Sequence, residues 1–432
     1  MLSFWNFAAK NLLRNKRRTI STAVAICVGF VGLNLLGAYI YRSKKALDVT
    51  SIYSAQRGHI SILKKDAVEF YQVKPKKYVL NLDEQNSIQK ILANMSNDVE
   101  YFGYRLTVSG LLSNGIKSHP VVIYGFDPLA FKKSLQQSDL IKWAKDWIIP
   151  SQLENLDIFI NKPDTLSLTD RIADILSVSK PYAGHDDLQI AARSIDGDLN
   201  AINVSLGAEH TTGMQFLEDT VVLLPLKKVQ ELMNTDSVEA ISIYLKPNIN
   251  IDKFIEKFNS ELKMNNLNID IFKYDDVEIN SLHQGTMGFL YVMGGFFVFL
   301  ICSAVSLTII NSLTMGIIER TREIGTLRAV GFTVNHVVNL FLKEGILLSV
   351  FSMSAGIVFS FIIAEIVNRL NIKFFPPGAS QQIQFVLNWN MIIACVVFLL
   401  LLFISWISSY VVIRQKMKVK LINLINDSGE IL

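Results

Sequence analysis

Residues Ile318 to Phe332 read IERTREIGTLRAVGF, a short charged stretch that follows one long apolar run and precedes another. An apolar run of about 20 residues is long enough for a helix to cross the hydrocarbon core of a bilayer. A charged stretch between two such runs must lie in water against the membrane face, where a soluble partner can reach it. The stretch therefore predicts a membrane protein and marks a point at which a partner could act on it.

The composition predicts that one part of the chain lies in the membrane and another part lies in water. Its 432 residues are 50% hydrophobic and 19% charged, with a mean hydropathy of +0.32. This is too apolar for an ordinary soluble enzyme and too charged for membrane helices alone. The net charge of +4 is small, which argues against nucleic acid as a partner. Cys27, Cys302 and Cys395 all fall in apolar runs and are expected to be buried packing residues, without a disulfide framework or metal site.

Four apolar runs are predicted to span the membrane, at residues 19–41, 286–313, 337–367 and 390–413. Residues 1–18 precede them and have the pattern of a helix that lies in the membrane interface. The first run ends in large residues before Arg42, which favours a retained helix over a cleaved signal peptide.

Basic residues predict the orientation. They cluster in 1–18, in the loop 314–336 and in the tail 414–432, and the positive-inside rule places these regions in the cytoplasm. The segment 42–285 and the short loop 368–389 are then outside it. Both termini are expected on the cytoplasmic side.

Residues 42–285 contain no comparable apolar run and alternate β-branched stretches with amphipathic helical patterns, which predicts a large α+β extracytoplasmic domain. Strands are predicted at HISIL, VVIYGF, DTVVLLPL and AISIYL, which begin at His59, Val121, Asp219 and Ala240. Helices are predicted at 83–95, 226–234 and 251–263. The middle of the segment, 129–211, is less regular and could be an inserted lobe.

The chain offers no convincing catalytic or cofactor site. The stretch GLLSNGIKS, residues 110–118, resembles a phosphate-binding loop, but Ile116 stands where a lysine should follow the second glycine. A strand, a turn at Asn114 and Gly115, and a second strand explain the stretch better. The six histidines lie singly, without the spacing of zinc ligands. We expect no catalytic residue, no metal site and no cofactor in this chain.

Small and polar residues within the third span indicate packing. Ser352, Gly356 and Ser360 recur four apart, and small residues let helix backbones approach closely in lipid. Packing within one chain and a seam between two copies both fit this pattern. Glu344 lies near the end of the same span, where interfacial water is expected to solvate it.

The charged stretch is predicted to be a short amphipathic helix. Ile324, Leu327 and Val330 recur at helical spacing among alternating acids and arginines, so one face can lie on the bundle and the other can bind a partner. Gly325 permits close approach, and Gly331 is expected to stop the helix. A solvated interfacial turn is the alternative.

Several stretches together resemble a known family. These are ERTREIGTLRAVGF from Glu319, the pair Glu344 and Gly345, RNKRRT before the first span, RGHISI from Arg57, VVIYGFDP from Val121 and PPGAS from Pro376. The chain resembles the FtsX-like and MacB-like permeases of ABC transporters, the mechanotransmission class that includes the LolC and LolE lipoprotein-releasing subunits. The first stretch resembles the coupling helix of that family closely.

The resemblance implies a permease that pairs with a second copy or a sister permease and with a dimer of cytoplasmic ABC ATPases. ATP and Mg would be bound by these ATPases, which are expected to be separate chains because this chain begins at the interfacial helix. By analogy the outer domain would be a MacB-like periplasmic core, with a Porter-like lobe from 56–128 and 212–280 and a Sabre-like lobe from 129–211.

Two sets of residues are expected to carry the implied function. Coupling to the ATPase is assigned to Glu319, Arg320, Arg322, Glu323, Ile324, Gly325, Leu327, Arg328 and Gly331. A substrate path with an apolar lateral entry is assigned to Leu36, Tyr39, Ile40, Phe289 and Phe296. Aromatic residues at these span ends are equally typical of interfacial anchors.

We therefore expect a permease of the Gram-negative inner membrane that extracts or exports a lipoprotein or another amphiphilic substrate. Membrane lipid and a periplasmic carrier or adaptor are the further expected partners. The alternative is an FtsX-like transmembrane sensor that signals to a periplasmic hydrolase or peptide-response system without moving cargo. A membrane-anchored surface enzyme is a third possibility, for which the sequence shows no catalytic set.

Overall fold

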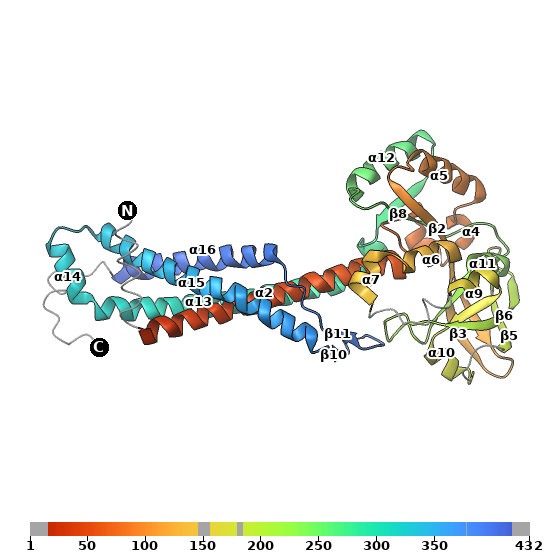
Figure 1. Cartoon of the computed structure of the whole chain (residues 1–432). Helices are drawn as coiled ribbons and strands as arrows, with labels where there is room; N and C mark the ends of the chain where they lie inside the picture. The colour runs from red at the N-terminus through yellow and green to blue at the C-terminus, as the bar shows by residue number, and fades with distance from the viewer. Residues whose placement is uncertain (1–15, 146–155, 179–184, 377, 417–432) are drawn as a thin grey trace. The chain divides into compact units, whose positions relative to one another are not determined.

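The structure is a computed structural model that describes residues 16–145, 156–178, 185–376 and 378–416 (Figure 1). The chain divides into two compact units. The helical unit contains residues 1–42, 288–372 and 385–432, and the α+β unit contains residues 43–287 and 373–384. Most of the interfacial helix expected at 1–18 lies outside the described residues.

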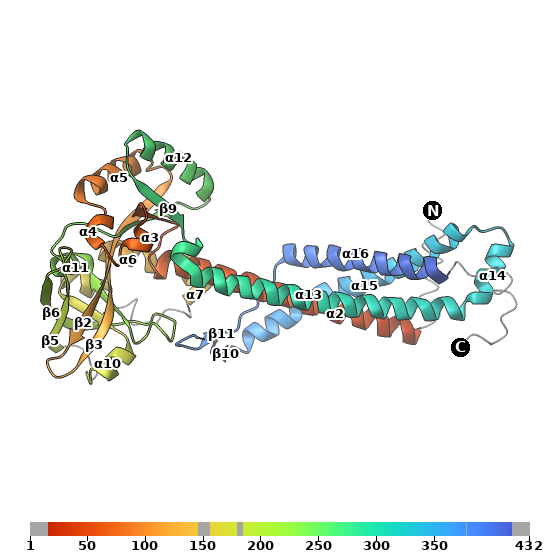
Figure 2. The same cartoon turned by 180° about the vertical axis from the view of Figure 1, so that it is seen from behind.

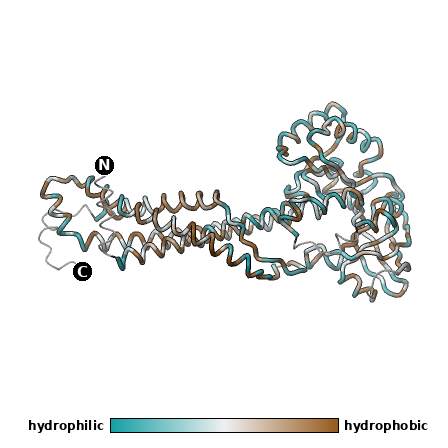
Figure 3. The backbone as a smooth tube through the Cα atoms, viewed as in Figure 1, coloured by the Kyte–Doolittle hydropathy of each residue, from teal (hydrophilic) through white to brown (hydrophobic). Residues whose placement is uncertain are grey.

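Among the described residues, four helices are long and apolar enough to cross a membrane. They are α2 (Lys16–Val49), α13 (Val277–Glu319), α15 (Val334–Arg369) and α16 (Met391–Lys416). Figure 3 shows the hydrophobic residues that run along them. The four predicted spans are confirmed as helices, but each helix is longer than its span. The first continues through Val49 into one π-helical segment, η1 (Thr50–Ser54), and α13 has non-helical backbone angles at Asn280.

The helical unit has its own apolar core. It contains Ile26, Phe30, Leu33, Val305, Ile309, Met353, Ala394, Val397 and Leu401. Gly356 of α15 lies directly against α2, because a Cβ atom built on it would be 2.7 Å from Cδ1 of Phe30. Asn34 Nδ2 donates a hydrogen bond of 2.8 Å to Ser360 Oγ. The row Ser352, Gly356 and Ser360 is therefore packed within one chain.

The three cysteines are free thiols. Cys27 and Cys302 are half-buried, whereas Cys395 is exposed on α16. The expectation of a buried residue is wrong for Cys395, because an apolar run does not show which helix face a bundle covers.

The α+β unit is built on a nine-stranded sheet in the order β3-β7-β4-β6-β5-β2-β8-β1-β9, in which β3 also pairs with β2. Its strands are β1 (Ile60–Lys64), β2 (Val99–Ser113), β3 (Ser118–Phe126), β4 (Thr165–Leu168), β5 (His185–Arg193), β6 (Leu199–Glu209), β7 (Val221–Pro225), β8 (Ala240–Leu245) and β9 (Ile269–Lys273). Because β2 and β3 pair, strands β2 to β7 close into a ring, and β8, β1 and β9 extend from it.

Helices cover the two ends of this sheet. They are α3 (Ala67–Phe70), α4 (Pro75–Tyr78), α5 (Leu82–Asn94), α6 (Pro128–Leu135), α7 (Ser138–Ala144), α9 (Leu156–Asn161), α10 (Asp170–Ile175), α11 (Leu226–Met233) and α12 (Ile251–Met264). Figures 1 and 2 show α5 and α12 beside the extension, and α10 and α11 beside the ring. We call the ring with α9, α10 and α11 the ring lobe.

The predicted strands and helices of this unit are confirmed. The four predicted strands correspond to β1, β3, β7 and β8, and the three predicted helices to α5, α11 and α12. The helix bounds differ by one residue because caps decide them. For example, the Asn81 side chain accepts the N–H of Glu84, which starts α5 at Leu82.

The expected inserted lobe shares its sheet with the rest of the unit. Residues 129–211 contribute β4, β5 and β6, but the ring also needs β2, β3 and β7. Strand β2 pairs with β8 over Val99–Arg105 and with β3 over Arg105–Ser113, so it belongs to both ends of the sheet. The boundary at residue 129 therefore coincides with no break in the sheet.

The turn at Asn114 and Gly115 is confirmed. It joins β2 to β3, and Gly115 has φ +84°. Asn114 Oδ1 accepts the N–H groups of Ile116 and Lys117 at 3.0 and 2.7 Å. The stretch that resembled a phosphate loop is a β-hairpin turn.

The connection from α15 to α16 belongs to the α+β unit, which the sequence analysis did not predict. Residues 373–384, which we call the strap, include β10 (Lys373–Phe374) and β11 (Ile383–Gln384). Ala379 forms a β-bridge with Met214. The Gln215 N–H donates to the Gly378 carbonyl at 2.9 Å, and the Ser380 N–H donates to the Gly213 carbonyl at 3.2 Å. The strap is thus held on the ring lobe by its backbone.

Acidification is expected to destabilise the α+β unit through His59. Its Nδ1 accepts the Leu245 N–H at 3.1 Å, and burial lowers the pKa of His59 from 6.5 to about 4. His59 is therefore protonated below pH 6.5 in the unfolded chain, but only below about pH 4 in the folded chain. The contribution of neutral His59 to the free energy of unfolding is complete above pH 6.5. It is lost as the pH falls towards 4, by up to about 3 kcal/mol.

The comparison that tests this is the pH dependence of thermal unfolding, followed by circular dichroism, for the wild type and His59→Asn. The asparagine oxygen can still accept the Leu245 N–H but does not titrate. The variant should lose less stability than the wild type between pH 6.5 and 4. Equal losses would contradict the assignment.

Candidate functional site

The charged stretch forms α14 (Thr321–Ala329), between α13 and α15 at one end of the helical unit (Figure 1). Arg320 breaks the helical path before it, with φ −108° and ψ 16°. After it, the Phe332 N–H donates to the Leu327 carbonyl and the Gly331 N–H to the Arg328 carbonyl, both at 3.1 Å. With φ +101° at Gly331, this is a Schellman motif. The predicted stop at Gly331 is confirmed.

The helix α14 has an inner and an outer face, as predicted. Ile324 is 1% exposed and Gly325 is buried, whereas Arg322 and Glu323 are exposed. Ile324 packs in a cluster with Ile317, Val337, Val338, Phe341, Leu342 and Ile413. Val330 was expected on the inner face but is 75% exposed. The helical period no longer applies to it, because it lies beyond the last residue of the helix.

The most informative contact is an ion pair between Arg320 and Glu344. Arg320 Nη1 lies 2.9 Å from Glu344 Oε2, and the two side chains are 5% and 9% exposed. The Arg320 guanidinium also lies 5.9 Å from the centre of the Phe341 ring. The expectation that interfacial water solvates Glu344 is therefore wrong, because the break before α14 turns Arg320 back onto α15. The assignment of Arg320 to coupling stays a prediction.

Glycine brings the helices together beside this pair. A Cβ atom built on Gly345 would lie 2.9 Å from Ser409 Oγ of α16. The position next to Glu344 therefore has no room for a side chain. The close contact of α15 with α16 requires a residue without a side chain at this position, which accounts for the glycine.

A second ion pair links the end of α13 to the start of α2. Arg18 Nη1 lies 2.6 Å from Glu319 Oε2, with side chains 20% and 38% exposed. One turn away, Thr22 Oγ1 donates a hydrogen bond of 2.8 Å to Ser312 Oγ. The residues on either side of the break before α14 are thus attached to two different helices, Glu319 to α2 and Arg320 to α15.

The predicted coupling residues divide into three groups. Glu319, Arg322, Glu323 and Gly331 are exposed, Leu327 and Arg328 are half-buried, and Arg320, Ile324 and Gly325 are buried. The sequence did not predict that Arg320 pairs with Glu344 or that Glu319 pairs with Arg18. The only signal was the opposite charge of residues next to apolar runs, which does not identify pairs so far apart in sequence.

The residues of the predicted substrate path do not share one environment. Leu36 is half-buried, and Ile40 packs on α13, where a Cβ atom built on Gly294 would lie 2.7 Å from its Cδ1. The Tyr39 ring stacks on Phe385, with 5.2 Å between centroids. The other two lie on the surface of α13, where Phe289 is 64% and Phe296 is 54% exposed.

Comparison with known proteins finds a family match for part of the helical unit. Residues 295–417 match the model of the FtsX-like permease C-terminal domain. An uncharacterized ABC transporter permease of Methanocaldococcus jannaschii is 24% identical over 204 residues, which are 46% of this chain and 49% of the relative. The ABC transporter permease YtrF of Bacillus subtilis is 31% identical over 121 residues, 28% of each chain. The chain thus spans about half, or less, of the curated relatives it matches.

Solved structures similar to the chain include two outer domains. The periplasmic region of MacB from Actinobacillus actinomycetemcomitans is 11% identical, with a TM-score of 0.35, over 51% of this chain and 91% of that one. The extracellular domain of the transporter YknZ from Gram-positive bacteria is 10% identical, with a TM-score of 0.31, over 50% of this chain and 99% of that one.

Proposed function

We infer that this chain, which belongs to the FtsX-like permease family, is the membrane subunit of an ABC transporter and receives movement from a separate ATPase at α14. The observation that carries this proposal is the buried Arg320 and Glu344 pair beneath an exposed charged helix face. A helix with one face in the bundle and one face in water can bind a partner without losing its own attachment. In this proposal α14 and both ends of the chain lie in the cytoplasm.

The contacts of α14 define how movement would pass into the spans. A push on α14 acts on Arg320, which joins α13 to α14, and on Glu319, the last residue of α13. Arg320 transmits it to α15 through Glu344, and Glu319 transmits it to α2 through Arg18. Buried and partly buried ion pairs hold a fixed geometry better than exposed ones, which suits them to this role. The ATPase dimer would bind the ATP and Mg, and this chain would supply no catalytic residue.

We further propose that the substrate is a lipoprotein or another amphiphile, handled on the outer side of the inner membrane. The exposed rings of Phe289 and Phe296 on α13 support this, since they offer an apolar surface to an acyl chain. A second permease copy, or a sister permease, would complete the path. Release of labelled lipoprotein from proteoliposomes on addition of ATP tests the substrate class. ATP hydrolysis without release would instead support a signalling role.

The docking role of α14 predicts that Glu323→Arg prevents assembly with the ATPase. The tagged chain, purified from cells of its source organism, should bring down an ATP-hydrolysing subunit that mass spectrometry can identify. Charge reversal on the exposed face should reduce the copurified ATPase at least about tenfold, which is about 1.4 kcal/mol of binding free energy. Arg328→Glu, on the half-buried edge of the same helix, should act in the same direction.

Glu365→Arg is the matched control, because Glu365 is an exposed acid of the same unit, near the far end of α15, and forms only an exposed pair with Arg369. It should leave the yield of ATPase unchanged. Full ATPase recovery with both α14 variants would refute the docking role.

A further inference from the structure

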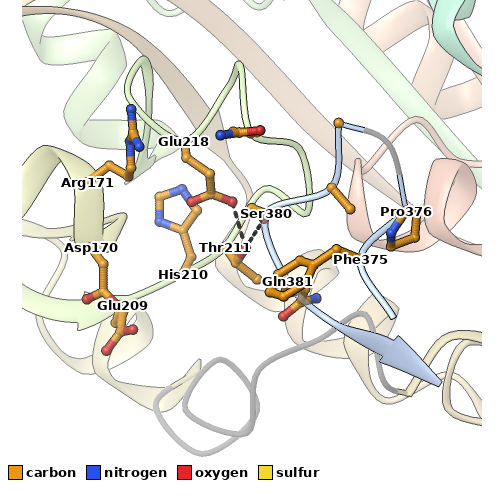
Figure 4. A pocket seen from close by; sticks show the side chains of 13 residues that line it. Asp170, Arg171, Glu209, His210, Thr211, Glu218, Phe375, Pro376, Ser380 and Gln381 are labelled. Atoms are coloured by element: carbon orange, nitrogen blue, oxygen red, sulfur yellow. Dashed lines mark hydrogen bonds between the residues drawn. The ribbon is translucent and has the colours of Figure 1, made fainter. Parts of the chain in front are cut away.

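A pocket of about 500 Å³ lies in the α+β unit where the strap meets the ring lobe (Figure 4). Its walls come from the start of α10, the end of β6, the loop before β7 and the strap. Pockets for small molecules in proteins usually measure about 300 to 1,000 Å³. The size therefore fits a small ligand, and the chemistry of the walls indicates which kind.

Glu218 is a buried carboxylate without a cationic partner. It is 7% exposed, and its Oε1 accepts hydrogen bonds from Thr211 Oγ1, the Thr212 N–H and Thr212 Oγ1 at 2.6, 2.8 and 2.8 Å. Within the described part of the chain, no basic side chain forms an ion pair with it. The three neutral donors hold the carboxylate in place through one oxygen. A buried carboxylate without a counter-charge is unfavourable unless a cation joins it.

His210 lies beside Glu218 among the side chains that line the pocket (Figure 4). It is 4% exposed, its Nδ1 lies 3.0 Å from Ser167 Oγ, and its Nε2 has no hydrogen-bond partner among the described residues. Burial lowers the pKa of His210 to about 4, so at neutral pH it supplies no positive charge to Glu218. When Nδ1 carries the proton and donates to Ser167, Nε2 is a buried acceptor that lacks a donor.

The remaining walls are acidic on one side and apolar on the other. Asp170 and Glu209 add two carboxylates to that of Glu218. The guanidinium in the walls, that of Arg171, lies 3.5 Å from Asp219, outside the pocket. Phe375 and Pro376 of the strap supply apolar surface. The Glu218 carboxylate, with which no basic side chain of the described residues forms an ion pair, and the apolar wall together describe a site for an organic cation.

We propose that this pocket binds a small molecule or headgroup that carries a primary ammonium group on an apolar stem. Glu218 Oε1 already accepts three hydrogen bonds, so only Oε2 can accept one from a ligand. A guanidinium binds a carboxylate in bidentate fashion through both oxygens, so this arrangement disfavours it. An ammonium carries its three donors on one atom and can donate one of them to Oε2. The described residues contain no group of three His, Cys, Asp or Glu arranged to hold a metal ion.

Binding in this pocket would fasten the strap to the ring lobe. Ser380 of the strap already lies 3.1 Å from Thr211 Oγ1, the hydroxyl that also donates to Glu218. A ligand between Glu218 and Phe375 adds a contact across the same junction. The strap is continuous in sequence with α15 and α16, so occupancy would restrain the segment that joins them. The proposal holds whether or not an ATPase acts at α14, and its test does not require one.

Isothermal titration of the full-length chain in detergent tests the site with hexylamine, which carries an ammonium on an alkyl stem. Hexanol lacks the charge and choline lacks N–H donors. Saturable binding of hexylamine, with hexanol and choline at least about tenfold weaker, is expected from a charge-assisted hydrogen bond to a buried carboxylate. Absence of saturable binding, or equal affinity for choline, overturns the proposal. If phosphatidylethanolamine vesicles compete with hexylamine and phosphatidylcholine vesicles do not, the natural ligand is a lipid headgroup. If neither kind of vesicle competes, the natural ligand is a free amine.

Glu218→Gln removes the charge at nearly constant shape and should weaken hexylamine binding at least about tenfold. Glu231→Gln is the matched control, an exposed glutamate on α11 of the same lobe, and should bind as the wild type does. Phe375→Ala removes the exposed ring of the apolar wall and provides a second variant, should Glu218→Gln fail to fold, and it should also weaken binding. Wild-type affinity in a folded Glu218→Gln or Phe375→Ala protein refutes the site.

Discussion

Arg320→Ala is expected to destabilise the helical unit and to uncouple it from the proposed ATPase. The substitution leaves the Glu344 carboxylate buried and unpaired, since its side chain is 9% exposed and Arg320 Nη1 lies 2.9 Å from its Oε2. Breaking a buried pair from one side typically costs about 3 to 5 kcal/mol. Thermal unfolding in detergent should show the loss of stability, and ATP hydrolysis by the copurified complex should lose its dependence on added substrate.

The double variant Arg320→Met with Glu344→Leu separates the two effects. Replacing both partners of a buried pair with apolar residues of similar volume is often neutral or stabilising. The double variant should therefore regain stability, whereas coupling should stay lost, because the ion pair that attaches Arg320 to α15 is gone. If Arg320→Ala keeps wild-type stability and coupling, the ion pair contributes to neither of them. If the double variant couples as the wild type does, the two side chains contribute to packing and not to coupling.

Gly356→Leu is expected to disrupt the helical bundle. A Cβ atom at this position would already lie 2.7 Å from Phe30 Cδ1 and 3.1 Å from Phe30 Cβ and Cγ. Phe30 is fully buried, so it has no free space to enter, and α2 and α15 must separate. Overpacking of this kind typically costs about 1 to 3 kcal/mol, and more where backbones must move. A lower midpoint of thermal unfolding and a lower yield of purified protein should follow.

Gly288→Leu is the matched control, because nothing lies within 4 Å of a Cβ atom built on that glycine of α13. Its stability should equal that of the wild type. Adding Phe30→Ala to Gly356→Leu should recover part of the loss by making room for the leucine. If Gly356→Leu unfolds at the wild-type temperature, α2 and α15 do not pack closely at this point.

The sequence was sufficient for features that depend on local pattern. Long apolar runs predicted the four spans, since membrane thickness sets the length of a helix that crosses it. Alternating β-branched residues predicted β1, β3, β7 and β8. In the candidate site, helical spacing predicted that Ile324 is buried, and the preference of glycine for positive φ predicted the stop at Gly331.

Features that depend on distant partners could not be predicted in this way. Arg320 looks solvated within a charged stretch, and only the position of Glu344 on α15 shows that it is buried. The closure of the ring depends on the pairing of β3 with β7 and of β2 with β5, which lie far apart in sequence and leave no periodic signal. The strap was expected to be an ordinary loop, because PPGAS has loop composition and its β-bridge partner Met214 lies far away in sequence.

The closed ring of strands has a consequence for the modularity of the outer unit. Residues 129–211 supply β4, β5 and β6 of a ring whose other members are β2, β3 and β7. Removing them would leave unpaired backbone donors and acceptors on β7, where β4 pairs with it, and along the end of β2 that pairs with β5. Exposed edges of this kind recruit other strands and promote aggregation. Residues 129–211 therefore cannot be deleted as an independent domain. A shortened unit would need another strand to pair with the exposed edges of β7 and β2.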